Sequence, residues 1–303
     1  MKAYYSDHFV LPLPTGHRFP MEKYRLLRLR VEEMEGVELL EAPLASESSL
    51  ARAHTLAYIK KVTEGSLSER ELREIGFPWS KLMVERSKRS AGATIQACLS
   101  ALTDGIAVNL AGGTHHAYAD KGSGFCVFND AVVAAKNIQQ SHQKACVAII
   151  DLDVHQGNGT ASICQDDSSI FTLSIHGEKN FPFRKESSNL DIGLMDGCGD
   201  GEYLEVLSKA LMTLKGSFTP DMIIYLAGAD PHEGDRLGRL HLTLDGLRER
   251  DQMVLNFAKD FQCPIAIAMA GGYGRIIETT VEIHAQTIQL ALDYYNKRKE
   301  TFA

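Results

Sequence analysis

The sequence of 303 residues has no long apolar run, and none of its runs approaches the roughly 18 residues of a membrane-spanning helix. The first residues, Met-Lys-Ala-Tyr-Tyr-Ser-Asp-His, contain no apolar core of a secretory signal. The six cysteines form no Cys-x-x-Cys pair and have no spacing typical of a disulfide framework. These absences argue against a membrane or secreted protein, and we expect reduced thiols and a cytoplasmic location.

An excess of positive charge is also missing. The 39 acidic residues outnumber the 32 lysines and arginines, which gives a net charge of −7. Because nucleic-acid binding usually needs a basic surface, we expect no nucleic-acid partner, whereas cationic substrates are compatible with this charge. No linker rich in proline, glycine or serine, no repeat and no low-complexity segment interrupts the chain, so we expect a single domain over residues 1–303.

What the sequence does contain is five short apolar runs, each followed by residues that can bind a metal or move a proton. The runs are 105–110 before His115 and His116, 145–150 before Asp151, Asp153 and His155, 170–175 before His176, 222–226 before Asp230, and 265–269 before Tyr273. Runs of this kind are typical of strands that are buried on both faces. In a parallel α/β sheet the carboxyl ends of the strands form the site, so we expect these polar residues to converge.

Helical patterns alternate with the apolar runs, over residues 21–34, 81–102, 128–140, 202–214, 244–261 and 276–297. This alternation predicts an α/β fold with a central, mainly parallel sheet and helices on both faces. We interpret the arginine-rich segment 21–30 as a solvated helix face. Residues 177–200 have little periodicity, and we expect a long functional loop there.

Asp151, Asp153 and His155 are spaced two residues apart, so they share one side if the backbone stays extended after the strand. Asp153 and His155 could then bind one ion together with Asp230. Three N and O ligands leave a fourth position open, which is typical of catalytic zinc, although iron and cobalt remain alternatives. Asp151 could instead orient a histidine. The simpler alternative is a polar turn after a buried strand.

His115 and His116 follow two glycines and suit proton transfer, because imidazole titrates near neutral pH. Tyr273 lies between glycines and could donate a hydrogen bond to a developing oxyanion. Exposed loop histidines and a tyrosine packed at a glycine turn are the alternatives. Combined with a metal that activates water, these residues predict amide hydrolysis.

Five motifs in this order resemble the zinc-dependent histone deacetylase superfamily, which includes acetoin-utilisation proteins and acetylpolyamine amidohydrolases. They are Gly112-Gly-Thr-His-His-Ala117, Gly124-Phe-Cys-Val-Phe-Asn-Asp130, Asp151-Leu-Asp-Val-His-Gln-Gly-Asn-Gly-Thr160, Gly228-Ala-Asp230 and Gly271-Gly-Tyr273. Two further segments, Ile75-Gly-Phe-Pro-Trp79 and Gly234-Asp-Arg-Leu-Gly238, are most similar to the class IV branch and its bacterial relatives.

The resemblance implies an arginase-like, three-layer α/β fold and a set of site residues. The implied zinc ligands are Asp153, His155 and Asp230. His116 would be the main general base and acid, His115 would act electrostatically, and Tyr273 would polarise the carbonyl. Asp151 would lie behind His115, and Asn158 stands behind His116 where class I members have an aspartate. A neutral partner stabilises an imidazolium less than a carboxylate does.

The resemblance also implies a substrate tunnel and a second cation. Gly124 and Phe125 would line the acyl-lysine tunnel, Leu237 would lie at its mouth, and either Phe181 or Phe183 would form the second aromatic wall. A structural potassium ion would be bound by Asp151, Ser174 and the backbone carbonyls of Asp153, His155 and Ile175.

The function that follows from this resemblance is zinc-dependent hydrolysis of Nε-acyl-lysine, as a deacetylase or a long-chain deacylase. Two alternatives stay open: deacetylation of a small molecule such as an acetylated polyamine, and a catalytically silent metal-binding interaction module. Arginase-like chemistry is disfavoured, because Gly157 stands where a second metal would need an aspartate. Acyl length, the physiological target and the oligomeric state are not determined by these motifs.

Overall fold

The computed structural model describes residues 1–142 and 145–302, and its centre is an eight-stranded parallel sheet in the order β2-β1-β3-β8-β7-β4-β5-β6. The strands are β1 (Lys2–Tyr5), β2 (Glu38–Glu41), β3 (Ile106–Asn109), β4 (Val147–Asp151), β5 (Ile170–Gly177), β6 (Leu190–Leu194), β7 (Met222–Leu226) and β8 (Ile265–Ala268). The five predicted strands are the five central ones, β3, β8, β7, β4 and β5. The predicted α/β fold is therefore confirmed.

The helices are α1 (Glu22–Glu32), α2 (Glu47–Leu50), α3 (Leu56–Glu64), α4 (Glu69–Ile75), α5 (Lys81–Asp104), α6 (Asp130–Ser141), α7 (Asn158–Cys164), α8 (Asp200–Ser217), α9 (Leu244–Asp260) and α10 (Ile277–Phe302). Each predicted helix overlaps one of the longer helices α1, α5, α6, α8, α9 and α10. The prediction of a loop throughout 177–200 is wrong at Leu190–Leu194. These residues form the edge strand β6, whose backbone pairs with β5 although only Leu194 of its five residues is buried.

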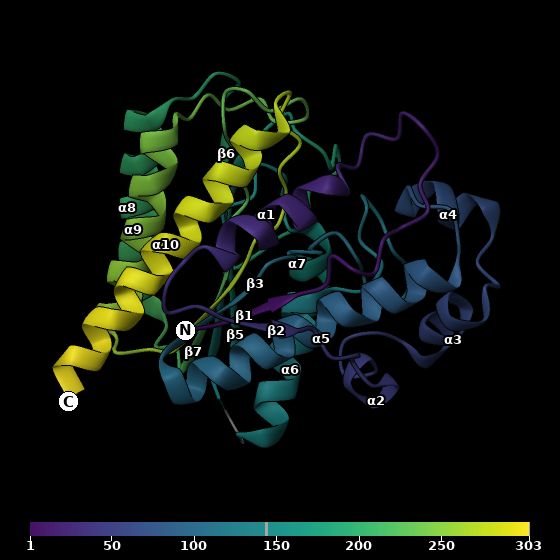
Figure 1. The fold of residues 1–303 in the computed structure, drawn as a ribbon, viewed down its shortest axis with the longest axis horizontal. Coiled ribbons are helices and arrows are strands. Elements are labelled where there is room, and N and C mark those ends of the chain that lie inside the picture. The colour runs from purple at the N-terminus through teal and green to yellow at the C-terminus, as the bar shows by residue number, and fades with distance from the viewer. Residues whose placement is uncertain (143–144, 303) are drawn as a thin grey trace.

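Two layers of helices cover the sheet, with α1, α8, α9 and α10 on one face and α5 and α6 on the other (Figure 1). Alternate side chains of each central strand enter the two cores. On β4, for example, Ala148 and Ile150 pack on the first side and Val147 and Ile149 on the second. Because both faces are buried in this way, polar residues are confined to the strand ends, where the connecting loops begin.

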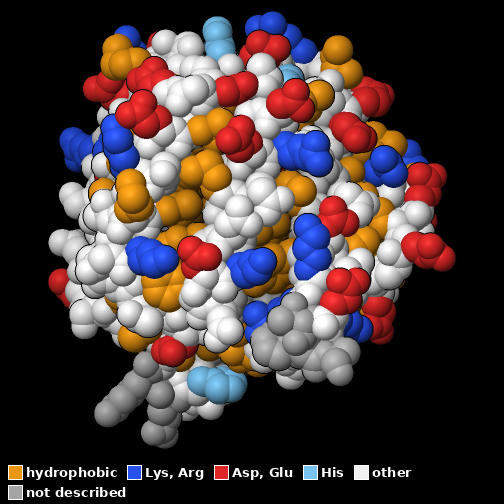
Figure 2. All heavy atoms as spheres, turned by 90° about the vertical axis from the view of Figure 1, so that its left-hand side faces the viewer, with side chains coloured by type: hydrophobic (Ala, Val, Ile, Leu, Met, Phe, Trp, Pro, Cys, Tyr) orange, Lys and Arg blue, Asp and Glu red, His pale blue; other side chains and the backbone are white. Residues whose placement is uncertain are grey.

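The outer surface of the layer formed by α8, α9 and α10 carries mixed charge. Acidic and basic side chains are interspersed there, with no large area of one sign (Figure 2). Two of the ion pairs join Lys209 to Glu205, at 2.6 Å, and Lys215 to Asp260, at 3.4 Å. Within residues 1–142 and 145–302, no helix has the length and apolar character needed to cross a membrane.

Candidate active site

The predicted site residues lie in loops that follow four adjacent strands. The loop after β3 carries His115 and His116, and the loop after β8 carries Tyr273. Asp230 follows β7, and Asp153 follows β4. Since these strands are parallel neighbours, their carboxyl ends lie at one edge of the sheet, where sites of such folds form.

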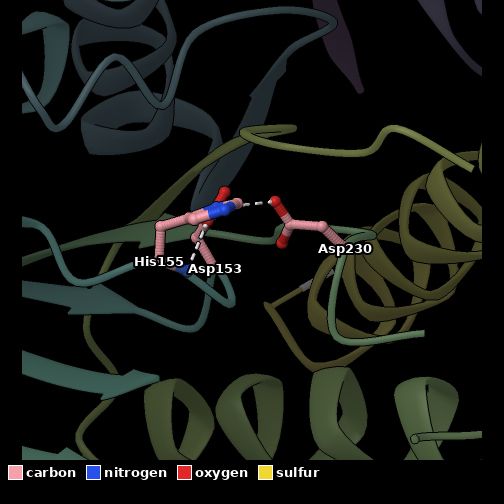
Figure 3. A group of neighbouring side chains, drawn as sticks. All are labelled: Asp153, His155 and Asp230. Atoms are coloured by element: carbon pink, nitrogen blue, oxygen red, sulfur yellow. Dashed lines mark hydrogen bonds and ion pairs between the residues drawn. The ribbon is translucent and has the colours of Figure 1, made fainter. Parts of the chain in front are cut away.

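Asp153, His155 and Asp230 form a compact buried cluster. One potential ligand atom from each residue lies within 4.8 Å of the other two. His155 Nδ1 is 2.9 Å from Asp153 Oδ1 and 3.3 Å from Asp230 Oδ2. Figure 3 shows the carboxylate of Asp230, in the loop after the neighbouring strand β7, pointing toward the His155 ring. The structure thus brings together the three residues that the sequence suggested as metal ligands.

The cluster fits a metal ion on two observations. Asp230 Oδ2 is buried and has no hydrogen-bond partner among the residues that the structure describes. The space beside it exists only because residue 271 is glycine: a Cβ there would lie 1.9 Å from Asp230 Oδ2 and 2.5 Å from Asp153 Oδ2. Two carboxylates and an imidazole, with room beside them, match the N and O donors of an open zinc site.

Buried charge in this cluster also favours a bound cation. Burial lowers the pKa of His155, but its hydrogen bond with Asp153 and the nearby charges of Asp153 and Asp230 outweigh burial and raise the pKa to about 10. Burial raises the pKa of Asp230 to about 7, and the neighbouring Asp153 adds to this. The metal-free cluster therefore retains protons in place of a cation, and metal binding would release them.

The two carboxylates are held by backbone groups of neighbouring loops. Asp153 Oδ2 accepts a hydrogen bond of 2.7 Å from the backbone N–H of Gly271. Asp230 Oδ1 accepts one of 2.9 Å from the N–H of Val154. The loops after β4, β7 and β8 are consequently cross-linked at the site, which fixes the directions of the carboxylates.

Arg250 on α9 lies beneath these loops and was not anticipated from the sequence. Its side chain is fully buried, and Nη1 donates to the carbonyls of Gly228, at 2.6 Å, and Leu152, at 3.4 Å. Asp251 balances its charge at 2.8 Å. Arg250 thus joins the loop that carries Asp153 to the loop that carries Asp230. Its local sequence, Arg-Glu-Arg, resembles a solvated helix surface and gives no sign of this role.

We expect Arg250→Met to lower the free energy of unfolding by about 3–5 kcal/mol, because it leaves the buried charge of Asp251 without its partner. Denaturant unfolding measures this loss. Lys209→Met removes an exposed cation from α8 and should change stability by no more than about 0.5 kcal/mol. Equal stability of the two variants would contradict a structural role for Arg250.

The histidine pair consists of two rings in different electrostatic states. His115 Nδ1 lies 2.6 Å from Asp151 Oδ2, and His116 Nδ1 lies 2.6 Å from Asn158 Oδ1. Burial lowers the pKa of His115, but the charges of Asp151 and Asp153 outweigh it and raise the pKa to about 9. Burial lowers the pKa of His116 well below its ordinary value, and the charge of His115 adds to this. These opposite shifts favour a charged His115 and a neutral His116 at neutral pH.

The neutral His116 is oriented to accept a proton. Asn158 Nδ2 donates to the Tyr118 hydroxyl at 2.8 Å, which turns the amide oxygen toward His116. The proton of His116 then lies on Nδ1, where it is donated to Asn158, and the lone pair lies on Nε2. Because His116 borders the cavity, that lone pair is available to a reacting group.

Tyr273 is fixed through the backbone of its loop. Its N–H donates to Asp235 Oδ2 at 2.6 Å, and its carbonyl accepts from Arg236 Nε at 2.9 Å. Asp235 Oδ1 also accepts from the N–H groups of Leu237, at 2.7 Å, and Gly238, at 2.9 Å. Burial raises the pKa of the Tyr273 phenol well above its ordinary value, so the hydroxyl stays a hydrogen-bond donor. Asp235 was missed in the sequence, although an aspartate in a glycine-rich turn is a usable signal.

The interpretation of residues 21–30 as a solvated face is wrong for Lys23. Its side chain is buried, and Nζ donates to the carbonyls of Ala270 and Gly272, each at 3.3 Å. The ammonium group also lies 5.5 Å from the centre of the Tyr273 ring. A lysine among arginines on an amphipathic helix gave no local sign that it would be buried.

A cavity of about 560 Å³ opens beside these residues, and the predicted tunnel residues Gly124, Phe125 and Leu237 line it together with His116 and Tyr273. Phe181 packs edge-on against His116, with ring centres 4.9 Å apart. Phe183 also borders the cavity, but its side chain is 88% exposed. Of the two candidates for the second aromatic wall, the structure thus places Phe181 next to the histidine pair.

The implied potassium ligands come from the adjacent strands β4 and β5. Asp151 is paired in register with Ser174, and Ile175 follows directly. Asp151 Oδ1 accepts the N–H of Asp153 at 3.1 Å, and Ser174 Oγ lies 3.1 Å from His176 Nδ1. These residues are therefore neighbours, and the potassium site itself stays a prediction.

Known proteins are similar to this chain over most of its length. The histone deacetylase domain family matches residues 17–288. An uncharacterized protein of Picosynechococcus sp. is 41% identical over 294 residues, which are 96% of this chain and 98% of that protein. Histone deacetylase 2 of Arabidopsis thaliana is 32% identical over 266 residues, 83% of this chain and 68% of that protein.

Solved structures share the fold. An HDAC homolog from Aquifex aeolicus has a TM-score of 0.82 at 23% identity, covering 96% of this chain and 83% of that one. An HDAC homolog complexed with SAHA has a TM-score of 0.82 at 24% identity over the same fractions of the two chains. The chain therefore belongs to the histone deacetylase family of hydrolases.

Proposed function

We propose that this hydrolase cleaves the amide of Nε-acyl-lysine in a zinc-dependent reaction. The observation that supports this most is that three residues border the same cavity. They are His155 of the metal-binding cluster, the neutral His116 and the protonated Tyr273. These are a metal position, a proton acceptor and a hydrogen-bond donor, and amide hydrolysis needs all three.

Each residue of the site then has a distinct role. A zinc ion held by Asp153, His155 and Asp230 would supply a Lewis acid and activate water. His116 takes a proton from the attacking water at Nε2 and returns it to the departing lysine amine. The Tyr273 hydroxyl donates a hydrogen bond to the carbonyl oxygen as negative charge develops there. His115, held as a cation by Asp151, stabilises that charge without moving a proton.

The tunnel residues suit the apolar stem of a lysine. Phe125 and Phe181 border the cavity near the histidine pair and offer aromatic surface to its methylene groups. Phe125 has a φ of 65°, a conformation that is rare for a residue with a side chain. Its N–H donates to the carbonyl of Ile75 at 2.7 Å, and the end of α4 thereby helps to hold this conformation. We infer that the strain fixes the ring in the tunnel wall.

The proposal is tested with one lysine peptide that carries an acetyl, an octanoyl or a myristoyl group, with an acetylated polyamine alongside. Zinc-loaded protein should release the acyl group from at least one peptide, and removal of the metal by a chelator should stop the release. Tyr273→Phe should lower kcat more than it changes KM, because its hydrogen bond forms as charge develops. Turnover of the polyamine alone would favour small-molecule deacetylation, and no turnover of any substrate would favour the silent module.

Three further expectations accompany this proposal. A structural potassium ion at Asp151 and Ser174, a single domain over residues 1–303 and a cytoplasmic location are the arrangements that we propose. Measurement of bound metals in the purified protein tests the potassium expectation, and one zinc should be found as well. The stability of the protein should also depend on potassium.

A further inference from the structure

The mouth of the active-site cavity is bordered mainly by positively charged side chains. Five exposed cations lie there with one carboxylate, that of Glu74; the cations are Arg18, Arg73, Lys179, Arg236 and Arg239. The whole chain carries a net charge of −7, so the mouth has the opposite sign to the protein as a whole. The mixed charge over α8, α9 and α10 shows that this clustering does not extend over that face (Figure 2).

Part of this charge is neutralised by neighbours. Arg73 lies 3.4 Å from Glu69, and Arg239 lies 3.1 Å from Asp196. The carboxylate of Glu74 is itself occupied by Arg70 at 3.1 Å. These pairs are exposed, and each contributes little on its own.

The other three cations, Arg18, Lys179 and Arg236, have no carboxylate within 4.0 Å among residues 1–142 and 145–302. They come from three separate segments of the chain that all border the opening, and these three residues are here called the cationic rim. Charges that line a cleft together raise the local concentration of an oppositely charged ligand.

Arg236 is the best-ordered member of the cationic rim. Its Nε donates to the carbonyl of Tyr273 at 2.9 Å, and its Nη2 lies 3.4 Å from the carbonyl of Arg18. The guanidinium is therefore held over the Tyr273 loop and cannot turn away into solvent without breaking these bonds. The guanidinium is thus preorganised before a ligand binds, which reduces the conformational entropy that is lost on binding.

The depth of the cavity determines which part of a substrate meets these charges. If an acyl-lysine amide lies between His116 and Tyr273, as in the proposed function, the lysine stem passes Phe125 and the peptide backbone stays at the mouth. The acyl chain points inward, away from the cationic rim. The rim then contacts the residues that flank the lysine.

We propose that this site selects acyl-lysines whose neighbouring residues are acidic, and that it disfavours basic peptides and polyamines. This inference rests on the proposed function and narrows its substrate class. It also reverses the expectation from net charge, which was compatible with cationic substrates. The charge at the opening, and not the net charge, determines which substrates are preferred, because surface charges more than about 10 Å away are largely screened at 0.1 M salt.

Three peptides of equal length with the same acyl-lysine test the inference, with two glutamates, glutamines or lysines on each side of it. We expect kcat/KM to follow the order glutamate, glutamine, lysine, with about tenfold between the extremes at low salt. The differences should shrink toward equality at about 1 M salt. Equal rates at low salt, or the fastest turnover for the lysine peptide, would overturn the inference.

Two double variants locate the effect. Arg18→Gln with Lys179→Gln should reduce the glutamate-to-lysine ratio of kcat/KM several-fold. Lys209→Gln with Lys215→Gln removes the same total charge from exposed positions on α8 and should leave the ratio unchanged. If both double variants change the ratio equally, total charge and not the cationic rim is responsible. If none of the three peptides is cleaved, the proposed function itself fails; equal cleavage of all three rejects only the selectivity.

Discussion

His116→Ala is expected to lower kcat for acyl-lysine hydrolysis by about 10²–10⁴-fold, the usual contribution of a positioned general base. The variant loses the one ring of the pair that is neutral at neutral pH, and His115 cannot replace it because Asp151 keeps that ring protonated. Steady-state kinetics measure the loss. His241→Ala, an exposed histidine, is the matched control and should retain full activity. A kcat for His116→Ala within tenfold of the wild type would remove His116 from the mechanism.

A companion change tests the protonation state of His116 without deleting it. The neutral ring is the active form, and burial keeps its pKa well below the ordinary value, so the acid limb of the kcat/KM profile should lie below pH 6.5. Asn158→Asp places a carboxylate where the amide oxygen now lies, 2.6 Å from Nδ1, and stabilises the imidazolium. The acid limb should then move to higher pH by about one pH unit or more. An unchanged profile would mean that this limb reports another group.

Gly271→Ala should weaken metal binding by at least about 10- to 100-fold, the range found when groups that support metal ligands are altered. The added Cβ would lie 1.9 Å from Asp230 Oδ2, so the carboxylate must move out of the ligand position. The same Cβ would lie 2.5 Å from Asp153 Oδ2, which accepts the N–H of residue 271, so both carboxylates must shift. Competition with a chelator gives the affinity, and the rise in Tm on addition of zinc gives an independent measure.

The control for this change is Gly216→Ala on α8, where a Cβ would meet nothing within 4 Å. It should bind zinc as the wild type does. Asp230→Asn preserves volume and removes one buried charge, so it should also lose metal affinity while leaving the metal-free protein folded. Wild-type affinity in Gly271→Ala would show that the metal does not occupy the space between Asp153 and Asp230.

The central part of the fold could be predicted from the sequence because burial on both faces requires continuous apolar runs. β4 and β7 are buried at every position, and their runs are unambiguous. The edge strands lack this signal: β2 reads Glu-Leu-Leu-Glu and β6 reads Leu-Asp-Ile-Gly-Leu, and apart from Leu194 their residues are exposed or half-buried. Their strand structure depends on backbone pairing with a neighbour that is distant in sequence, which no local pattern reveals.

The same distinction explains what was found and missed at the site. Asp153, His155, Asp230 and Tyr273 follow predicted strands, so topology alone brings them together. Lys23 and Arg250, by contrast, act through carbonyl groups of remote loops. Their burial becomes visible only when helices α1 and α9 are placed against the sheet. The charge at the cavity mouth is likewise a property of assembled loops and cannot be read from a total of −7.

The position of β8 has a consequence for how the protein is made. This strand follows the other seven strands in the sequence, yet it lies in the middle of the sheet between β3 and β7. While the chain emerges from the ribosome, the strands β2, β1 and β3 cannot join the strands β7, β4, β5 and β6, because β8 lies between the two groups. Until β8 is made, β3 and β7 each present an unpaired strand edge. The loop that follows β8 also carries Gly271, whose N–H orients Asp153. A nascent chain therefore cannot complete the cluster of Asp153, His155 and Asp230 until residues up to Gly271 have left the ribosome.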